Sequence, residues 1–186
     1  DLDLLADLAA DNLCSVAISI PTMNDDLKRV MEPRIPSATP RLKAMRSLSD
    51  YGVPTSALLA PIIPAINDNE IESILEAVAS AGANQAHYIF LRLPHELLDI
   101  FSEWLEAHFP DRKERVLSLL RQASGGRPYD ARFGVRQTGR GAYADMLASR
   151  FRTASRKLGL AADSYQHSLE CGRFVKPGQQ QLGLDF

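Results

Sequence analysis

Apolar residues along this chain recur in two spacings, and the alternation between the spacings predicts strands that alternate with helices. Three short apolar runs are predicted strands: residues 14–20, 56–61 and 86–93. The central run is apolar without interruption over residues 57–63, which is typical of a strand covered on both faces. Pro61 and Pro64 cannot donate to a sheet ladder, so we expect this strand to stop near Ala60.

The segments around these strands carry apolar residues three and four positions apart, the spacing of one helix face. Helices are predicted over residues 1–11, 39–51, 68–81, 94–108, 112–122 and 143–158. Inward-facing side chains are expected at Ile71, Ile74, Leu75, Val78, Leu97, Leu98, Phe101, Trp104, Leu105, Met146, Leu147 and Phe151. Pro40 is expected at the first position of its helix. Asn67, followed three residues later by Glu70, is expected to start the next helix as a capping-box variant.

Three strands alternating with helices predict an α/β fold of consecutive βαβ units, with a parallel sheet and right-handed crossovers. Three strands are too few to close a barrel, so the pattern is interpreted as the second half of one. We expect a half-barrel over residues 1–109, a basic helical extension over 110–160 and a tail over 161–186. The first strand would expose a hydrogen-bonding edge, so the chain is expected to self-associate or to pair with a partner.

Charge is distributed unevenly, although the whole chain has a formal net charge of only -2. Residues 111–157 contain twelve Lys and Arg but four Asp and Glu, which suggests an anionic partner for this part. No apolar run reaches the length of a membrane span, and the first residues lack the basic and apolar regions of a signal peptide. Cys14 and Cys171 lie far apart and are expected to be thiols in a reducing compartment, the cytoplasm.

A set of short motifs follows in order along the chain: M-E-P-R (31–34), R-L (41–42), Y-G-V-P (51–54), A-P-I-I-P-A-I-N-D (60–68) and G-A (82–83). Together they resemble the rear half of the radical S-adenosylmethionine proteins related to spore photoproduct lyase, the DNA repair photolyase group. Four later motifs resemble a bacterial branch of that group: L-R-L-P-H-E (91–96), F-P-D-R (109–112), G-G-R-P-Y-D (125–130) and R-F-G (132–134).

This resemblance implies a partial (β/α)6 barrel whose last three strands are the three predicted here. The family holds a four-iron four-sulfur cluster with three cysteines spaced C-x3-C-x2-C, and this sequence has no such motif. We therefore expect a C-terminal fragment that lacks an N-terminal half-barrel as its partner. The parent protein would bind the cluster and S-adenosylmethionine, while this chain would bind neither and would be inactive alone.

Four polar residues are candidates for contact with the cofactor. Ser19 matches a fourth-strand position that in the family contacts the ribose or the amino-acid end, and a hydroxyl can both donate and accept; the alternative is a small polar filler. Thr22 is a second candidate, or it caps the loop. Glu32 and Arg34 flank a proline and would grip the ammonium and carboxylate, unless they form an internal salt bridge.

Two further places complete the candidate cofactor site. Ala60, Pro61 and Ile62 occupy the fifth-strand position where the family packs apolar groups against adenine; the alternative is ordinary packing at a strand end. Arg92 puts a charge at the end of an apolar strand, where it needs a partner or water, and a role in the site is favoured. The histidines show no metal-ligand spacing, and no catalytic residue is identified.

Two regions are candidates for binding macromolecules. Arg127, Arg132, Arg136 and Arg140 are interleaved with Tyr, Phe and Gly, a composition suited to nucleic-acid phosphates and stacked bases; the alternatives are a solvated surface or a strap paired with acidic helices. The terminal residues Gln181, Leu182, Leu184 and Phe186 resemble the short peptides that dock bacterial DNA-processing proteins on the sliding clamp. The alternative there is a disordered end.

Two functional hypotheses follow, beside the alternative of a different small α/β domain whose motifs match by chance. In the first, the chain is part of a radical S-adenosylmethionine, iron–sulfur enzyme with lyase-like chemistry, acting in DNA repair or nucleic-acid modification. In the second, it is a DNA-repair accessory or binding module whose basic extension and clamp-like peptide carry the function. An upstream sequence with three clustered cysteines would favour the first hypothesis.

Overall fold

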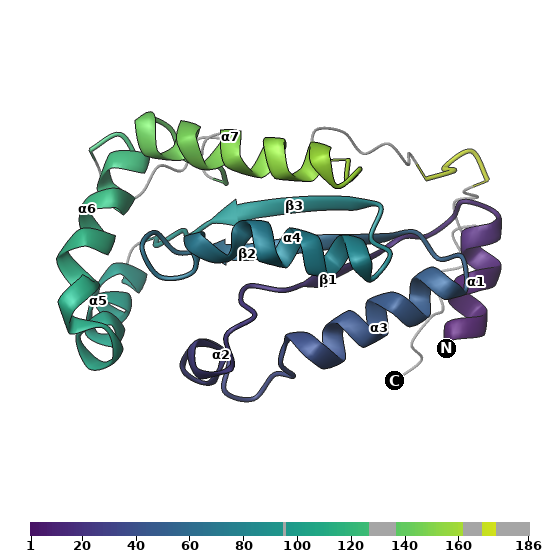
Figure 1. The fold of residues 1–186 in the computed structure, drawn as a ribbon, viewed down its shortest axis with the longest axis horizontal. Coiled ribbons are helices and arrows are strands. Elements are labelled where there is room, and N and C mark those ends of the chain that lie inside the picture. Colours follow the sequence, from purple (N-terminus) through teal and green to yellow (C-terminus); the bar gives the residue numbers. More distant parts are fainter. Residues whose placement is uncertain (95, 127–136, 162–168, 174–186) are drawn as a thin grey trace, which may run out of the picture.

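The computed structural model describes residues 1–94, 96–126, 137–161 and 169–173. Its centre is a three-stranded parallel sheet in the order β1-β2-β3 (Figure 1). The strands are β1 (Val16–Ser19), β2 (Thr55–Ile62) and β3 (Gln85–Phe90). Ala17 of β1 lies opposite Ser56 of β2, and Ala57 lies opposite Ala86 of β3. The predicted α/β class and the parallel βαβ order are confirmed.

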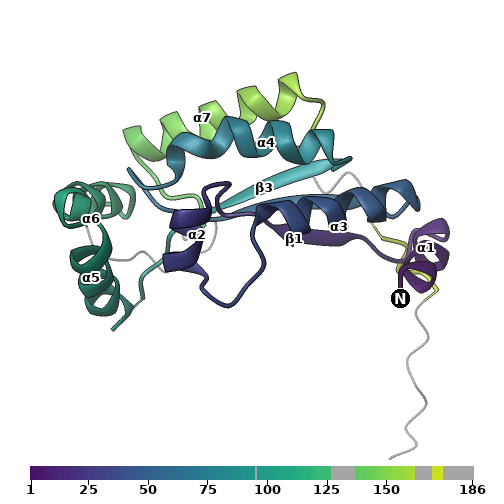
Figure 2. The ribbon, with the colours of Figure 1, turned by 60° about the horizontal axis from the view of Figure 1, so that its bottom comes forward.

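Seven α-helices and two short 3-10 turns surround the sheet in the part of the chain that the structure describes. They are α1 (Leu2–Ala10), α2 (Asp25–Met31), α3 (Ala38–Asp50), η1 (Asp68–Glu70), α4 (Ile71–Ser80), α5 (Leu97–His108), η2 (Pro110–Arg112), α6 (Lys113–Ala123) and α7 (Ala142–Lys157). Helices α3 and α4 lie on one face of the sheet, and α7 runs beside α4 (Figures 1 and 2). Helices α5 and α6 lie near the carboxyl ends of the strands, and α1 lies at the opposite end. None of the described helices is long and apolar enough to cross a bilayer.

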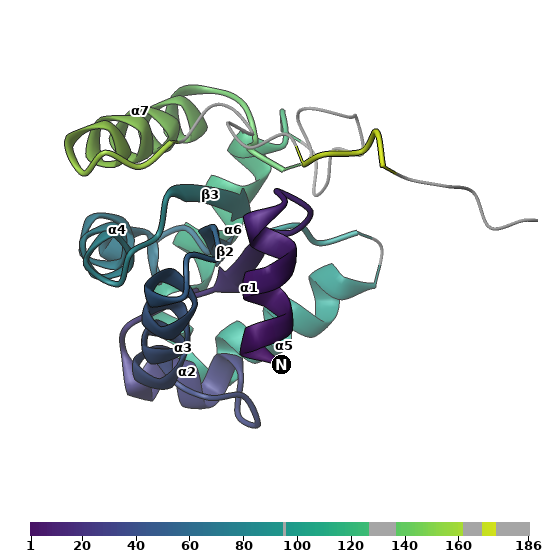
Figure 3. The same cartoon turned by 90° about the vertical axis from the view of Figure 1, so that its right-hand side faces the viewer.

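The hydrophobic core lies between the sheet and the helices on that face. Four residues of α4 that the periodicity predicted to be inward, Ile71, Ile74, Leu75 and Val78, are buried. Along β2, Thr55, Ala57 and Leu59 are buried while the residues between them are only half-buried. The unbroken apolar run predicted a strand covered on both faces, and this is wrong for the described residues, since one face of β2 is the more open. Figure 3 shows α3 and α4 together on one side of the sheet.

The end of β2 differs from the prediction. The strand does not stop at Ala60 but continues through Pro61 to Ile62. The register with β3 shifts between Leu59 and Ile62, because Ile62 lies opposite Phe90 and one extra residue is accommodated. A bulge of this kind is a place where a strand tolerates proline, since the ladder is interrupted there anyway.

Several helix predictions also need correction. Helix α2 was not expected, although Asn24 caps it by accepting hydrogen bonds from the Asp26 and Leu27 N–H groups. Helix α3 begins at Ala38, so Pro40 is its third residue and not its first. Leu97 and Met146, expected to face inward, are 42% and 41% exposed.

These two exposed side chains have a common physical reason. Leu105 of α5 and Leu147 and Phe151 of α7 are buried in the core. Leu97 lies in the first turn of α5, and Met146 lies beside Leu147 in α7. Both side chains lie outside the stripe that faces the core, because a helix that packs on one side buries only that side.

The two edges of the sheet are treated differently. At β3, the Ala86 N–H donates to the Ala161 carbonyl (3.1 Å) and the Phe90 N–H donates to the Gln137 carbonyl (2.7 Å). The segments before and after α7 therefore cover both ends of the β3 edge. No strand within the described ranges pairs with the outer edge of β1.

Candidate functional site

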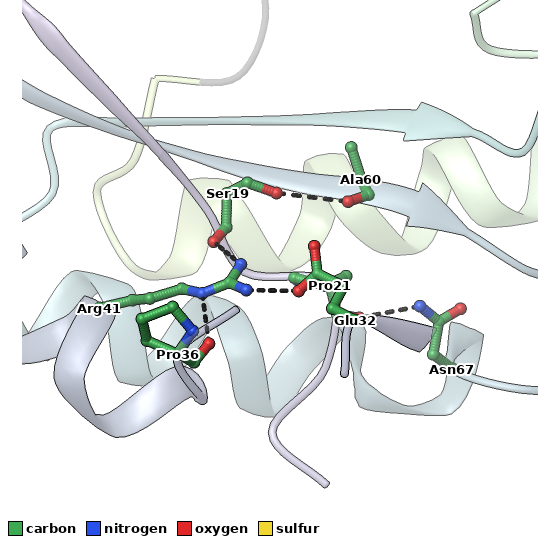
Figure 4. Close-up of polar contacts among 7 residues, drawn as sticks. All are labelled: Ser19, Pro21, Glu32, Pro36, Arg41, Ala60 and Asn67. Atoms are coloured by element: carbon green, nitrogen blue, oxygen red, sulfur yellow. Dashed lines mark hydrogen bonds and ion pairs between the residues drawn. The ribbon is translucent and has the colours of Figure 1, made fainter. Parts of the chain in front are cut away.

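The carboxyl ends of the three parallel strands meet at one end of the sheet, which is where α/β folds bind ligands. Ser19 is the last residue of β1, and its half-buried hydroxyl donates to the Ala60 carbonyl of β2 at 3.3 Å (Figure 4). This distance is long for an O–H···O hydrogen bond. The Ser19 hydroxyl is therefore held only weakly within the protein.

Arg41 of α3 organises the loop that follows β1. Its guanidinium donates to the Ser19 carbonyl at 2.7 Å and to the Pro36 carbonyl at 2.9 Å, and it forms an ion pair with Glu32 (Figure 4). The Arg41 side chain is only 11% exposed. Glu32 is therefore committed to Arg41, so it is not a free carboxylate for a cofactor ammonium.

Asn67 connects the ends of β1 and β2. Its side-chain amide donates to the Pro21 carbonyl at 2.8 Å and to the Pro61 carbonyl at 2.9 Å, and it accepts from the Ile63 N–H at 2.7 Å. The side chain makes no cap hydrogen bond to the following turn. The prediction that Asn67 and Glu70 form a capping box is therefore wrong, because tertiary partners occupy both side chains.

Glu70 holds the other side of the same loop. Its carboxylate accepts from the Thr22 hydroxyl at 2.7 Å and from the Met23 N–H at 2.8 Å. The Thr22 hydroxyl in turn accepts from the Asn24 N–H at 3.0 Å. Thr22 is buried and fixes the entry to α2, so it has no hydroxyl proton left for a ligand.

A hollow of about 790 Å³ runs along the strands and reaches α7. Small and apolar side chains line its floor, among them Ala17, Ser56 and Leu58. His87 of β3 is one titratable group of this lining, and burial lowers the pKa of its imidazole, which favours the neutral form at pH 7. Apolar and polar groups therefore line the hollow together, and Asp145 and Arg152 of α7 add charged groups to its wall.

The remaining cofactor candidates are dispersed. Ala60 and Pro61 are half-buried at the strand end, whereas Ile62 is buried toward the helices. Arg34 is exposed in the loop after α2, and Arg92 is half-buried beyond the last residue of β3. The structure thus brings Ser19, Ala60 and Pro61 together and leaves Arg34 outside that group.

Of the residues predicted to contact macromolecules, Arg140 alone falls in the described ranges. Its guanidinium lies over Gly125, where a Cβ would meet it at 1.8 Å. Gly125 also has φ +70°, a conformation that favours glycine. Arg127, Arg132, Arg136 and the terminal residues Gln181, Leu182, Leu184 and Phe186 lie outside the described residues.

Reasoning from the sequence missed Arg41 as a site residue and misassigned Asn67. Each binds one backbone carbonyl that is distant in sequence, Ser19 for Arg41 and Pro21 for Asn67, so no local spacing marks these contacts. The one available signal was the motif order, in which Arg41 and Asn67 both stand. Within the described residues, no group of three or more His, Cys, Asp or Glu could hold a metal ion.

Comparisons with known proteins found a family model that matches the first part of the chain. The family model described as the Radical SAM superfamily matches residues 1–78, which include β1, β2 and most of α4. These residues are thus similar to the radical S-adenosylmethionine superfamily over less than half of the chain, and the three-stranded parallel sheet is consistent with part of such a barrel. No solved structure matches the chain.

Three curated relatives are all named as uncharacterized proteins. One from Mycobacterium tuberculosis is 27% identical over 66% of this chain and 36% of its own length. One from Acidianus two-tailed virus is 30% identical over 52% of this chain and 32% of its own length. One from Methanocaldococcus jannaschii is 28% identical over 62% and 42% respectively. The matches thus span between 32% and 42% of the relatives' lengths.

Proposed function

We propose that this chain is the carboxyl-terminal part of a radical S-adenosylmethionine enzyme, forming the last three βα units of its barrel. The family match over residues 1–78 supports the proposal. So does the outer edge of β1, which lacks a partner strand in the described ranges, since further βα units would pair there. On this proposal, a preceding half-barrel is the physiological partner of the chain.

The chain's own residues do not fit an iron–sulfur cluster. Cys14 lies just before β1 at the amino end of the sheet and donates to the Leu5 carbonyl, and Cys171 is exposed far along the chain. Cluster ligands in this family come from three closely spaced thiolates, and two distant cysteines cannot supply them. The cluster would be held by another part of the parent protein.

The carboxyl ends of β1 and β2 fit part of a nucleoside cofactor better than they fit an iron–sulfur cluster. When bound, S-adenosylmethionine would supply the radical chemistry, and the residues here would only hold it. Ser19 is suited to this role because its hydroxyl makes just one long hydrogen bond, 3.3 Å to the Ala60 carbonyl, and can exchange that bond for one to a ligand. Ala60 and Pro61 offer half-buried apolar surface beside it.

The experiment begins with the mass of the protein isolated from its own host, which gives the natural amino terminus. In the full-length protein with its cluster, Ser19→Ala should weaken S-adenosylmethionine binding about threefold to tenfold, as expected for one lost hydrogen bond. The matched control is Ser15→Ala, an exposed serine at the opposite end of the same strand region. A natural start at Asp1, or equal affinity in both variants, would overturn the proposal.

A second candidate function, nucleic-acid binding, rests on the outer surface of α7. This surface presents exposed hydroxyl and basic side chains in one row: Ser149, Arg152, Thr153, Arg156 and Lys157. Within the described part of the chain, no carboxylate forms an ion pair with the three basic members. Such groups are the usual contacts of nucleic-acid phosphates, and they support a role in DNA repair or nucleic-acid modification.

Binding of a 20-nucleotide single-stranded DNA, measured by fluorescence anisotropy at several salt concentrations, tests this candidate. Replacing both Arg152 and Arg156 by Gln should weaken binding and flatten the salt dependence by about one unit of slope per lost contact. Arg46→Gln, an exposed arginine on α3, is the control. An affinity that does not change with salt concentration, or an equal loss of affinity in the control variant, would contradict nucleic-acid binding at this surface. Deleting residues 179–186 separately tests the proposed sliding-clamp peptide.

A further inference from the structure

We propose that Tyr143 and Arg150 of α7, with Arg112 of η2, are positioning residues for the candidate site. They act through the β2–α4 connection, residues 63–70, which holds the ends of β1 and β2 in place. The link to a cofactor rests on the function proposed above. The mechanical link, however, is a property of this chain alone.

The outer side of the connection and the first turn of α4 are contacted from the carboxyl-terminal helices at three points. The Tyr143 hydroxyl donates to Asp68 Oδ2 at 2.6 Å. Arg150 donates to both carboxylate oxygens of Glu72, at 2.9 and 2.7 Å. Arg112 donates to the Ala65 carbonyl at 3.2 Å. These contacts bridge between 47 and 78 positions of sequence.

The inner side of the same connection contacts the candidate site. Asn67 binds the Pro21 and Pro61 carbonyls, and Glu70 binds the Thr22 hydroxyl and the Met23 N–H. Inner and outer contacts therefore alternate within a few residues of one turn. A displacement of this turn from its outer partners must move the groups that hold the loop after β1.

The connection does not adopt its shape by local preference alone. Ala65 has φ 58°, in the left-handed region that residues with a Cβ disfavour. Strained backbone of this kind persists where surrounding contacts impose it. The Arg112 contact to the Ala65 carbonyl and the adjacent Tyr143 contact to Asp68 are such constraints.

The electrostatics of the two α7 contacts favour their formation at neutral pH. Burial, and then the hydrogen bond to Asp68, raise the pKa of the Tyr143 phenol, so the phenol stays protonated and able to donate. The hydrogen bonds from Arg150 lower the pKa of the Glu72 carboxyl, so the carboxylate stays charged. At neutral pH the phenol can therefore donate to Asp68 and the Glu72 carboxylate can accept from Arg150.

Hydrogen–deuterium exchange on the chain itself tests the proposal without any cofactor. Tyr143→Phe removes the hydroxyl and keeps the ring that packs edge-on against Phe90. We expect amide exchange of peptides covering residues 20–24 and 61–70 to become about fivefold to tenfold faster. Arg150→Gln should produce the same local increase, and Arg150→Lys should restore part of the protection.

Two controls make the outcome decisive. Arg152→Gln changes an exposed arginine of the same helix and should leave exchange in both peptides unchanged. Amide exchange in peptides from α3 should be unchanged in every variant. Faster exchange there as well would indicate global unfolding and not a local effect. Unchanged exchange at residues 20–24 in Tyr143→Phe, or equal acceleration in Arg152→Gln, would overturn the proposal.

Failure of this inference and failure of the proposed function give different results. If the variants loosen residues 20–24 but the full-length protein binds no S-adenosylmethionine, the positioning role stands and the proposed function is wrong. If S-adenosylmethionine binds, Ser19→Ala weakens that binding and Tyr143→Phe leaves amide exchange unchanged, the proposed function stands and the positioning role is wrong.

Discussion

Removing the Asn67 side chain should be among the most damaging changes in this protein. Asn67 is 2% exposed, and in Asn67→Ala the Pro21 and Pro61 carbonyls and the Ile63 N–H would lose their partner. Each buried polar group left unpaired costs about 1–3 kcal/mol, and water entering the vacated space recovers part of this. We therefore expect a loss of about 3 kcal/mol in the free energy of unfolding.

Urea unfolding followed by circular dichroism measures this loss. With a slope of about 2 kcal/mol per molar urea, the midpoint should fall by about 1.5 M. The matched control is Asn69→Ala, two residues away and exposed, which should change stability by less than about 0.5 kcal/mol. If the two variants unfold at the same urea concentration, the assignment of Asn67 as the joint between the strand ends is wrong.

Asn67→Asp sharpens the test through pH. The carboxylate would face two carbonyl oxygens, so folding would favour its protonated form and raise its pKa above the unfolded value. A group with a raised folded pKa contributes stability below the unfolded pKa and loses it as pH rises through the folded pKa. Asn67→Asp should therefore be more stable relative to Asn67→Ala near pH 4 than at pH 7, and the opposite trend would refute this account.

Three other predictions follow from single features. Ser155→Ala should raise the free energy of unfolding by about 0.5–1 kcal/mol, because the buried Ser155 hydroxyl has no partner among the described residues; a loss on urea unfolding would contradict this. Arg150 lowers the pKa of Glu72, so their contact stabilises the fold above the ordinary carboxyl pKa and is lost as pH falls through the folded value. The melting temperatures of Glu72→Gln and of the natural chain should therefore converge as the pH is lowered. A difference that widens in acid would contradict this role of the ion pair. The unpaired β1 edge should cause self-association in analytical ultracentrifugation, which Ala17→Pro should reduce; a strictly monomeric natural chain would rule this out.

The sequence predicted those elements in which local and tertiary preferences agree. In α4, the stripe at Ile71, Ile74, Leu75 and Val78 predicted both the helix and its buried face, because the helix packs along the side that the periodicity marks. Helix α2 is only seven residues long, too short for periodicity to identify, and its signal was the single cap at Asn24.

The candidate site was less accessible to such reasoning. Ser19 was placed correctly at the end of its strand, since strand direction and parity follow from alternation. Thr22 and Glu70 are 48 positions apart, so their pairing depends on how two loops meet. Arg41 has the same difficulty, since it joins the Ser19 carbonyl at the end of β1 to Glu32 and the Pro36 carbonyl in the segment before α3. The roles of the predicted cofactor residues remain predictions.

The contrast between the two sheet edges sets how far an assembly of this chain can grow. Backbone near Gln137 and Ala161 covers both ends of the β3 edge, so within the described residues the β1 edge is the more open to a new strand. Two copies joined through β1 by a twofold axis would pair antiparallel and form a six-stranded sheet. Both outer edges of that sheet would then be covered β3 strands. Association through this edge would therefore be self-limiting and would end at a pair.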